Sequence, residues 1–130
     1  MTPISFKSLT KPAITRDQLK AYAQASGDVN PIHLDETFAK EAGFPSVIAH
    51  GMLSMAFLGD AICLNFSPRT HRLTRFRCRF RKVIFPGDSL TCKGTVDSEE
   101  PSGLIKLNLQ IENQNGELTA DGDAELVSNP

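Results

Sequence analysis

The stretch of sequence that decides the fold is Gly51–Phe66, which reads GMLSMAFLGDAICLNF. Its apolar side chains cover nearly every side of a helical wheel, and Asp60 and Asn65 are the polar exceptions. A helix that is apolar all round is typical of the interior of a protein. Pro68 ends the predicted helix, because proline cannot continue a helix. We therefore predict one buried core helix over residues 51–66.

The residues that follow this helix alternate between polar and apolar side chains, as half-buried β-strands do. The first run is Arg75–Arg81, and further strands are expected at 90–96, 105–112 and 118–126. Short turns join such strands into an antiparallel sheet with one apolar face, which has to be covered. Only the helix at 51–66 is apolar enough to cover it. The sequence therefore predicts an α+β fold in which an antiparallel sheet wraps around one long buried helix.

One face of the first strand carries the arginines at positions 75, 77, 79 and 81. The last strand carries acids at positions 121, 123 and 125, which offset those charges where the two strands are neighbours. We interpret this face as solvated or inter-subunit surface. A contact between some of the arginines and a phosphate group is the alternative.

Two shorter helices are predicted before the core helix. Thr15-Arg16-Asp17-Gln18 has the form of a capping box and begins a helix that Gly27 ends. Asp35 caps a second helix over residues 36–42. The polar stretch between them, residues 25–35, is therefore a loop held between two helix ends.

This loop contains the first candidate site residues. Asp28 lies five residues before His33, and a carboxylate and an imidazole held together can move a proton or activate a water. The plainer interpretation is that Asp28 satisfies a turn and His33 makes a local hydrogen bond. His33, Asp35 and His50 also form a weak metal-binding pattern, but no cysteine pair or second helical histidine supports it, so we expect no metal.

The second candidate site is the start of the core helix, where His50 precedes Gly51. Glycine costs about 1 kcal/mol relative to alanine inside a helix, so its presence is not explained by helix stability. It lets a ligand approach the unpaired backbone N–H groups of the helix start, which favour negative charge. His50 is otherwise read as a polar lid on the core. We hypothesise that the loop and this helix start form one active site.

Length and charge exclude several classes of protein. The chain has 130 residues and is expected to form one domain over residues 1–130. A formal net charge of -1 gives no field that would draw it to nucleic acid. The apolar stretch 52–66 is too short for a membrane span and is interrupted by Asp60. Three widely separated cysteines and the lack of a signal-like apolar run near Met1 lead us to expect a cytoplasmic protein.

Two segments resemble a known family: YAQASGDVNPIHLD at residues 22–35 and IAHGML at residues 48–53. Together they resemble the MaoC-like (R)-specific enoyl-CoA hydratase and dehydratase family. The signature that carries the resemblance is Asp28-x-Asn30-Pro31-x-His33 followed by His50-Gly51-Met52. Residues 79–88 are similar to the strand and turn that follow in that family, and the resemblance continues to about residue 127. It implies a hot-dog fold, which agrees with a sheet wrapped around one helix.

The resemblance also implies a reaction. Asp28 and His33 would be the catalytic pair, the amide of Gly51 would bind the thioester carbonyl, and Asn30 and His50 would support them. The reaction would be (R)-specific hydration of a trans-2-enoyl-CoA, or another enoyl thioester, to the (R)-3-hydroxyacyl thioester, or the reverse dehydration, in fatty-acid metabolism. No cofactor is implied, because coenzyme A or the acyl carrier is part of the substrate. Which of Asp28 and His33 acts as the base stays open, as do carrier, chain length and direction.

Hot-dog domains of this length usually dimerise, so we expect a homodimer, with a dimer of dimers or a heterodimer as alternatives. Two other functions stay open on the same fold. One is a non-catalytic acyl-binding or partner subunit of a heterodimeric dehydratase. The other is a thioesterase, which would release a free thiol rather than consume a double bond.

Overall fold

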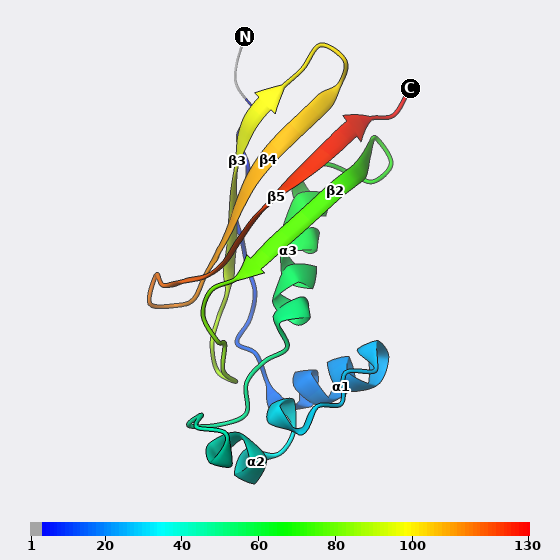
Figure 1. The fold of residues 1–130 in the computed structure, drawn as a ribbon. Helices are drawn as coiled ribbons and strands as arrows, with labels where there is room; N and C mark the ends of the chain where they lie inside the picture. The colour runs from blue at the N-terminus through cyan, green and yellow to red at the C-terminus, as the bar shows by residue number, and fades with distance from the viewer. Residues whose placement is uncertain (1–3) are drawn as a thin grey trace.

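The computed structural model describes residues 4–130 and contains one curved sheet and one long helix inside it (Figure 1). The helices are α1 (Arg16–Ser26), α2 (Glu36–Glu41) and α3 (Gly51–Asn65), with a short 3-10 helix, η1, at Pro31–His33. The strands are β1 (Leu9–Thr10), β2 (His71–Phe80), β3 (Thr91–Glu99), β4 (Leu104–Glu112) and β5 (Leu118–Ser128). The three predicted helices and the four predicted strands are all present, with bounds shifted by a few residues.

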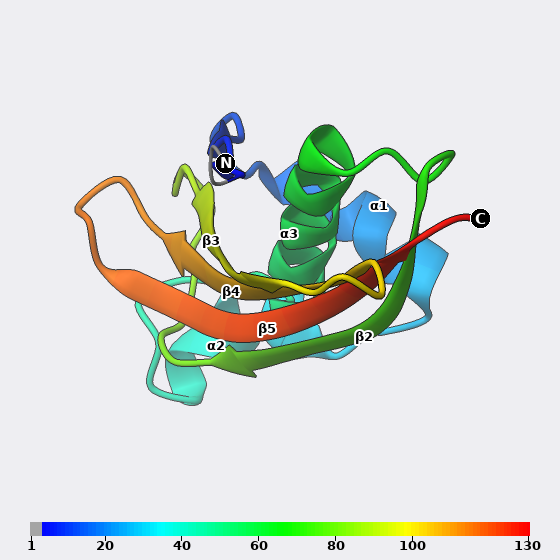
Figure 2. The same ribbon diagram turned by 90° about the horizontal axis from the view of Figure 1, so that it is seen from above.

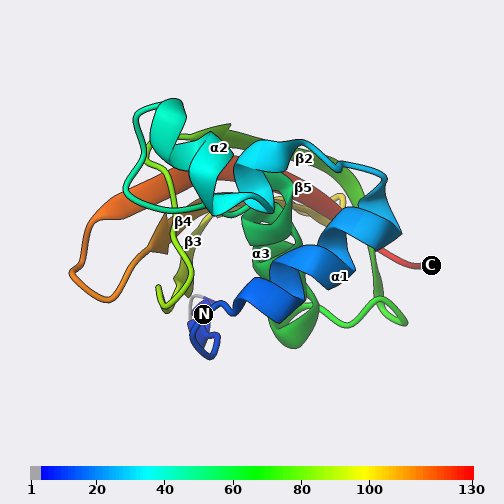
Figure 3. The ribbon, with the colours of Figure 1, turned by 90° about the horizontal axis from the view of Figure 1, so that it is seen from below.

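The sheet is antiparallel, with the strand order β1-β3-β4-β5-β2. Seen from above, it curves around α3 like a trough, and α1 and α2 lie beneath one end of that helix (Figures 2 and 3). β2 lies at the sheet edge opposite β1 and pairs with β5, not with β3, which follows it in sequence. The segment 81–90 therefore crosses from one side of the sheet to the other and passes the end of α3 where the predicted site lies. Periodicity predicts the strands but not this order.

The core lies between α3 and the concave face of the sheet. From the helix, the fully buried side chains include Leu58 and Ala61, and from the sheet they include Leu109, Ile111 and Ala120. Burying a leucine or isoleucine side chain contributes about 1.5–3 kcal/mol each, so this contact is the main source of stability. The predicted α+β wrap of a sheet around one helix is confirmed.

One side of α3 is not covered by the sheet. Met52 is 56% exposed and Leu64 is 53% exposed, and Ala56 and Cys63 are also exposed. The helical wheel does not predict this exposure. It shows which side chains lie on each side of the helix, but not which sides the rest of the chain covers. A mostly apolar stripe therefore faces the open side of the trough, and Asp60, which pairs with Lys11 at 2.7 Å, is its charged member.

The predicted charge pairing on the outer face of the sheet is confirmed. Arg75 lies opposite Glu125, Arg77 opposite Asp123 and Arg79 opposite Asp121. Ion pairs join Arg77 to Asp123 at 2.8 Å and Arg81 to Asp121 at 3.0 Å.

The close contact between β5 and β2 requires a glycine. A Cβ atom at Gly122 would lie 2.0 Å from the carbonyl oxygen of Arg77, which is backbone and has no side-chain freedom to move away.

No helix in the described part of the chain is long and apolar enough to cross a membrane.

Candidate active site

The loop after α1 is fixed by its own side chains. The helix ends at Gly27, whose φ of 80° is left-handed and suits glycine. The hydroxyl of Ser26 then accepts from the Asp28 amide at 3.1 Å, and the Asp28 carboxylate accepts from the Asn30 amide at 3.3 Å. The side chain of Asn30 accepts from the Ile32 amide at 3.1 Å and caps η1. These bonds form a series that holds Asp28 at a defined place.

His33 has one nitrogen bound to the backbone and one free nitrogen. Its Nδ1 lies 2.7 Å from the carbonyl oxygen of Ile48. A carbonyl oxygen can only accept, so Nδ1 carries the proton, and in the neutral ring Nε2 is an acceptor. Nε2 lies 3.7 Å from Oδ2 of Asp28. That distance is too long for a direct hydrogen bond, and polar groups so spaced are commonly bridged by a water molecule.

His50 lies directly beside this pair. Its side chain is only 1% exposed, and its Nε2 donates to the backbone carbonyl oxygen of Asp28 at 3.0 Å. The ring is stacked on that of His33, with centroids 3.8 Å apart and planes inclined by 25°. The ring of Tyr22 also packs against that of His50 in a T-shaped arrangement, with centroids 4.8 Å apart. Burial lowers the pKa of His50 below its ordinary value, so the ring is kept neutral.

Residues 48–50 join the loop to the core helix. The amide of Ile48 donates to the carbonyl oxygen of Ile32 at 3.1 Å. The amide of Ala49 donates to the carbonyl oxygen of Ile84 at 2.7 Å. With the bonds from His33 and His50, this short extended segment is tied to both sides of the site. The relative position of the loop and the helix start is therefore set by backbone hydrogen bonds.

Gly51 begins α3 next to the aromatic ring of Phe80. A Cβ atom at position 51 would lie 3.0–3.1 Å from three atoms of that ring. His50, at the N-cap, makes no side-chain capping bond. The N-terminal amides of a helix are donors without a partner in the helix and carry partial positive charge. They can therefore receive an oxygen that gains negative charge.

A pocket of about 310 Å³ connects these groups. One part of its wall contains His33 and Gly51, and another part is the segment that follows β2. The residues that line it are His33, Ile48, Ala49, Gly51, Phe80, Arg81, Lys82, Val83 and Ile84. The sequence does not predict Phe80 or the segment 81–84 as site residues. They lie far from the loop in the chain and reach it through the crossover between β2 and β3.

The structure brings most of the predicted site residues together. One ligand-capable atom each from Asp28, His33 and His50 lies within 4.8 Å of the others. Gly51 lines the same pocket, and Asn30 supports the loop. Asp35 does not join them, because its carboxylate accepts from the Phe38 amide at 3.2 Å and caps α2.

The arrangement of Asp28, His33 and His50 does not suit a metal ion. Imidazole lone pairs lie in the plane of the ring, and zinc is bound about 2.0–2.1 Å from the nitrogen. Rings stacked 3.8 Å apart and inclined by only 25° direct their lone pairs along nearly parallel planes, so both cannot reach one ion. The geometry therefore favours acid–base chemistry over metal binding.

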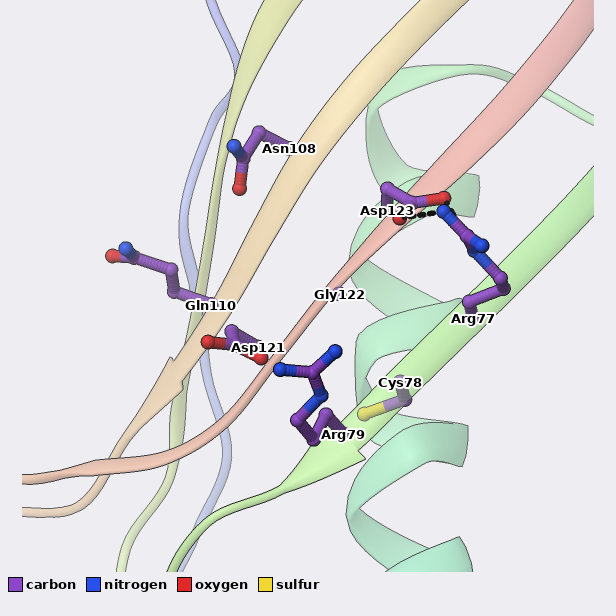
Figure 4. Close-up of a pocket in the computed structure, with 8 residues that line it drawn as sticks. All are labelled: Arg77, Cys78, Arg79, Asn108, Gln110, Asp121, Gly122 and Asp123. Carbon is purple, nitrogen blue, oxygen red and sulfur yellow. Dashed lines mark hydrogen bonds and ion pairs between the residues drawn. The ribbon is translucent and has the colours of Figure 1, made fainter.

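A second hollow lies on the outer face of the sheet and has a volume of about 560 Å³ (Figure 4). Arg77, Arg79, Asn108, Gln110, Asp121 and Asp123 line it, together with Cys78 and Gly122. Its acids are engaged by the ion pairs of the outer face. It contains none of the residues predicted for the active site.

Comparison with known proteins identifies the relatives of the chain. A family model described as "MaoC like domain" matches residues 5–110. The fatty acid synthase beta subunit TOXC of Cochliobolus carbonum is 34% identical over 83% of this chain. The probable enoyl-CoA hydratase 2 of Dictyostelium discoideum is 31% identical over 64% of it. The chain spans 5% of the length of the first relative and 29% of the second.

A solved structure with the same fold is the R-hydratase PhaJ1 of Pseudomonas aeruginosa in its unliganded form. It superposes with a TM-score of 0.86 at 29% sequence identity, and the match covers 97% of this chain and 86% of that one. The curled antiparallel sheet around one helix is therefore the hot-dog fold of this group.

Proposed function

The chain belongs to the MaoC-like domain family, and from that premise we propose that it is a hydro-lyase acting on acyl thioesters in fatty-acid metabolism. The reaction is the (R)-specific addition of water to a trans-2-enoyl thioester, or the reverse dehydration. The observation that carries the proposal is the pair of Asp28 and His33, with Nε2 and Oδ2 3.7 Å apart, beside a pocket that also contains Gly51. The names of the relatives, an R-hydratase and a probable enoyl-CoA hydratase 2, support it.

The two acceptors suit a water molecule between them. Nε2 of His33 and the carboxylate of Asp28 each accept one of its O–H groups, which fixes the direction of the oxygen lone pairs. One of the two removes a proton while the oxygen forms a bond to C3 of the enoyl group. The π electrons of the C2–C3 bond move toward the thioester oxygen. C2 then takes up a proton from the residue protonated in the first step, which returns the pair to its starting state. Water is thereby added across the double bond without a redox change or a cofactor.

The thioester carbonyl needs a donor where its oxygen gains charge. The amide of Gly51 lies at the positive end of α3, in the same pocket as His33. A donor already in place there stabilises the enolate-like transition state without reorganisation. The apolar wall made by Phe80, Val83 and Ile84 suits an acyl thioester.

The protomer is proposed to act as a homodimer. β2 pairs with β5 on one side only, so the edge of His71–Phe80 is free to pair with another strand. The exposed stripe of α3, with Met52 at 56% exposure, faces the open side of the trough and is apolar surface of the kind that proteins cover.

We propose that the enzyme acts in the cytoplasm. The three cysteines, all of them free, support this location.

The test is a direct assay of hydration. Loss of ultraviolet absorbance of crotonyl-CoA reports consumption of the conjugated double bond, and chiral analysis of the product reports the (R) configuration. Wild-type protein is expected to hydrate the substrate, and Asp28→Asn to lose about 100-fold or more, because one proton acceptor is gone. An Asp28→Asn rate equal to wild type would overturn the assignment. Release of free thiol without loss of the double bond would indicate a thioesterase instead.

A further inference from the structure

His50 takes no direct part in the chemistry proposed above, yet it is the most buried of the three clustered side chains. It is 1% exposed, whereas the side chains of His33 and Asp28 are 11% and 52% exposed. Its two polar contacts are with those same residues, a hydrogen bond to Asp28 and a ring stack on His33. Its position is therefore behind the proposed catalytic pair rather than in the pocket.

The second ring nitrogen of His50 lowers the stability of the fold, and packing alone does not explain why it is there. Nδ1 is buried and has no hydrogen-bond partner among the described residues. A buried polar atom left without a partner is destabilising, and such atoms in folded proteins call for an explanation. A phenylalanine would fill the same space between Tyr22 and His33 without that cost. The imidazole therefore supplies something other than stability.

What it supplies is a fixed geometry for two groups at once. Nε2 donates to the carbonyl oxygen of Asp28, so the backbone that carries the carboxylate is tied to the start of α3. The stack at 3.8 Å sets the plane of the His33 ring, whose own Nδ1 is held by Ile48. A carbonyl can only accept, so His50 must be the Nε2–H tautomer for the first contact to exist.

We propose that His50 is a positioning residue that holds Asp28 and His33 in their reactive arrangement through a neutral, tautomer-locked imidazole. The catalytic consequence rests on the proposed function of this site. The geometric part, a neutral Nε2–H ring, does not.

Neutrality of His50 matters because of the groups around it. The titratable groups that face it are Asp28 from the loop, His33 from η1 and Tyr22 from α1. Protonation would place an N–H at Nδ1 with no acceptor and a positive charge against the His33 ring. Burial opposes this by lowering the pKa of His50. At sufficiently acid pH, a proton on His50 should therefore disable the site.

Two variants separate the ring from the hydrogen bond. His50→Phe keeps a stacked ring and loses the donor, and His50→Gln keeps a donor and loses the ring. For His50→Phe we expect an unchanged or higher Tm and a kcat about 10- to 100-fold lower, with KM within about two-fold of wild type, because misplacement affects the transition state more than binding. His50→Gln should recover part of the kcat. A His50→Phe enzyme with wild-type kcat, or one whose loss follows a fall in folded fraction, would overturn the proposal.

The pH profile gives a readout that a merely structural role would not move. In wild type a proton on His50 should contribute to the fall of kcat/KM on the acid side of the profile. In His50→Phe the slope of this acid limb should be smaller by one proton. An identical limb in both enzymes counts against the proposal.

The tautomer is measured without turnover, by nitrogen-15 NMR of the three imidazoles of the full chain. His50 should be the neutral Nε2–H tautomer at neutral pH, because burial lowers its pKa. An Nδ1–H or protonated His50 at neutral pH would overturn the positioning proposal. A wild-type protein that shows the expected tautomer but hydrates no enoyl thioester would instead refute the proposed function and leave the geometry in place.

Discussion

The ring of Phe80 lies against the backbone of Gly51, so that a Cβ atom at position 51 would come within 3.0–3.1 Å of it. Real Cβ atoms seldom approach so closely, and either the ring or the start of α3 would have to move. We expect Gly51→Ala to lose most of its hydratase activity and to lower Tm, although alanine is the better helix former by about 1 kcal/mol. Activity and thermal unfolding are measured on the same preparation.

The double variant Gly51→Ala/Phe80→Leu is the matched control. The smaller, flexible leucine should relieve the contact and restore Tm. Activity should stay low, because the new methyl group lies in the pocket where the thioester oxygen must reach the amide. Full recovery of kcat in the double variant would show that the glycine serves packing alone.

Asn30 is expected to act through the loop and not by touching the substrate. Its side chain caps η1 by accepting from Ile32 at 3.1 Å, and removing such a cap costs about 0.5–2 kcal/mol. Asn30→Ala should therefore lower both stability and kcat, and Asn30→Asp, which keeps an acceptor, should recover both. Denaturant unfolding and steady-state kinetics check this. An alanine variant with normal kcat would remove Asn30 from the site.

Local patterns were enough to predict the helices and strands. The cap at Thr15, the stop at Gly27 and the alternation in 105–112 depend on residues close together in sequence, and the structure shows all three. Asp28 and His33 also lie on one short loop, so their proximity could be proposed from spacing.

Contacts between distant segments could not be predicted in this way. The stack of His33 on His50 depends on how η1 packs against the start of α3. The presence of Phe80 and Ile84 in the pocket depends on β2 pairing with β5 and on the crossover that follows. No single-strand periodicity specifies a partner strand, so this half of the site needs the tertiary structure.

The ion pair between Arg77 and Asp123 predicts a small pH effect on stability. The hydrogen bond from Arg77 holds the pKa of Asp123 below its ordinary value of 3.8. The pair therefore adds stability at pH values above 3.8, and this stability is lost as the pH falls through the lower pKa of the folded state. Because both side chains are largely exposed, the gain is small and is screened by salt.

Asp123→Asn should thus unfold at a slightly lower temperature than wild type at pH 7, and the difference should vanish once the pH falls below the lowered pKa of Asp123 in the folded state. Arg77→Gln serves as the second corner of a double-variant cycle. A difference between wild type and Asp123→Asn that grows as the pH falls would contradict the assignment of the shift to this pair.

The exposed stripe of α3 predicts how the oligomer can be broken. Ala56→Glu places an unpaired charge in the stripe, where the acid already present, Asp60, is paired with Lys11. Glutamate is a good helix former, so the protomer should fold normally. Light scattering after size-exclusion chromatography should show a dimer for wild type and a monomer for the variant. Ala21→Glu, at an exposed alanine of α1, makes the same chemical change elsewhere and should stay dimeric. A monomeric wild-type protein would refute the proposed dimer.

Gly122 is expected to be the glycine at which the fold tolerates substitution least. A Cβ atom there would lie 2.0 Å from the carbonyl oxygen of Arg77, and because that oxygen is part of β2, relief requires the two strands to separate. Overpacking costs about 1–3 kcal/mol and occasionally more, so Gly122→Ala should lower Tm strongly or prevent folding. Gly116→Ala is the matched control: its φ of 75° is left-handed but nothing lies within 4 Å of the new atom, so only about 1–2 kcal/mol of backbone strain is expected. Denaturant unfolding of both variants measures the difference. If Gly116→Ala proved the more damaging, the close contact between β5 and β2 would not be what makes Gly122 necessary.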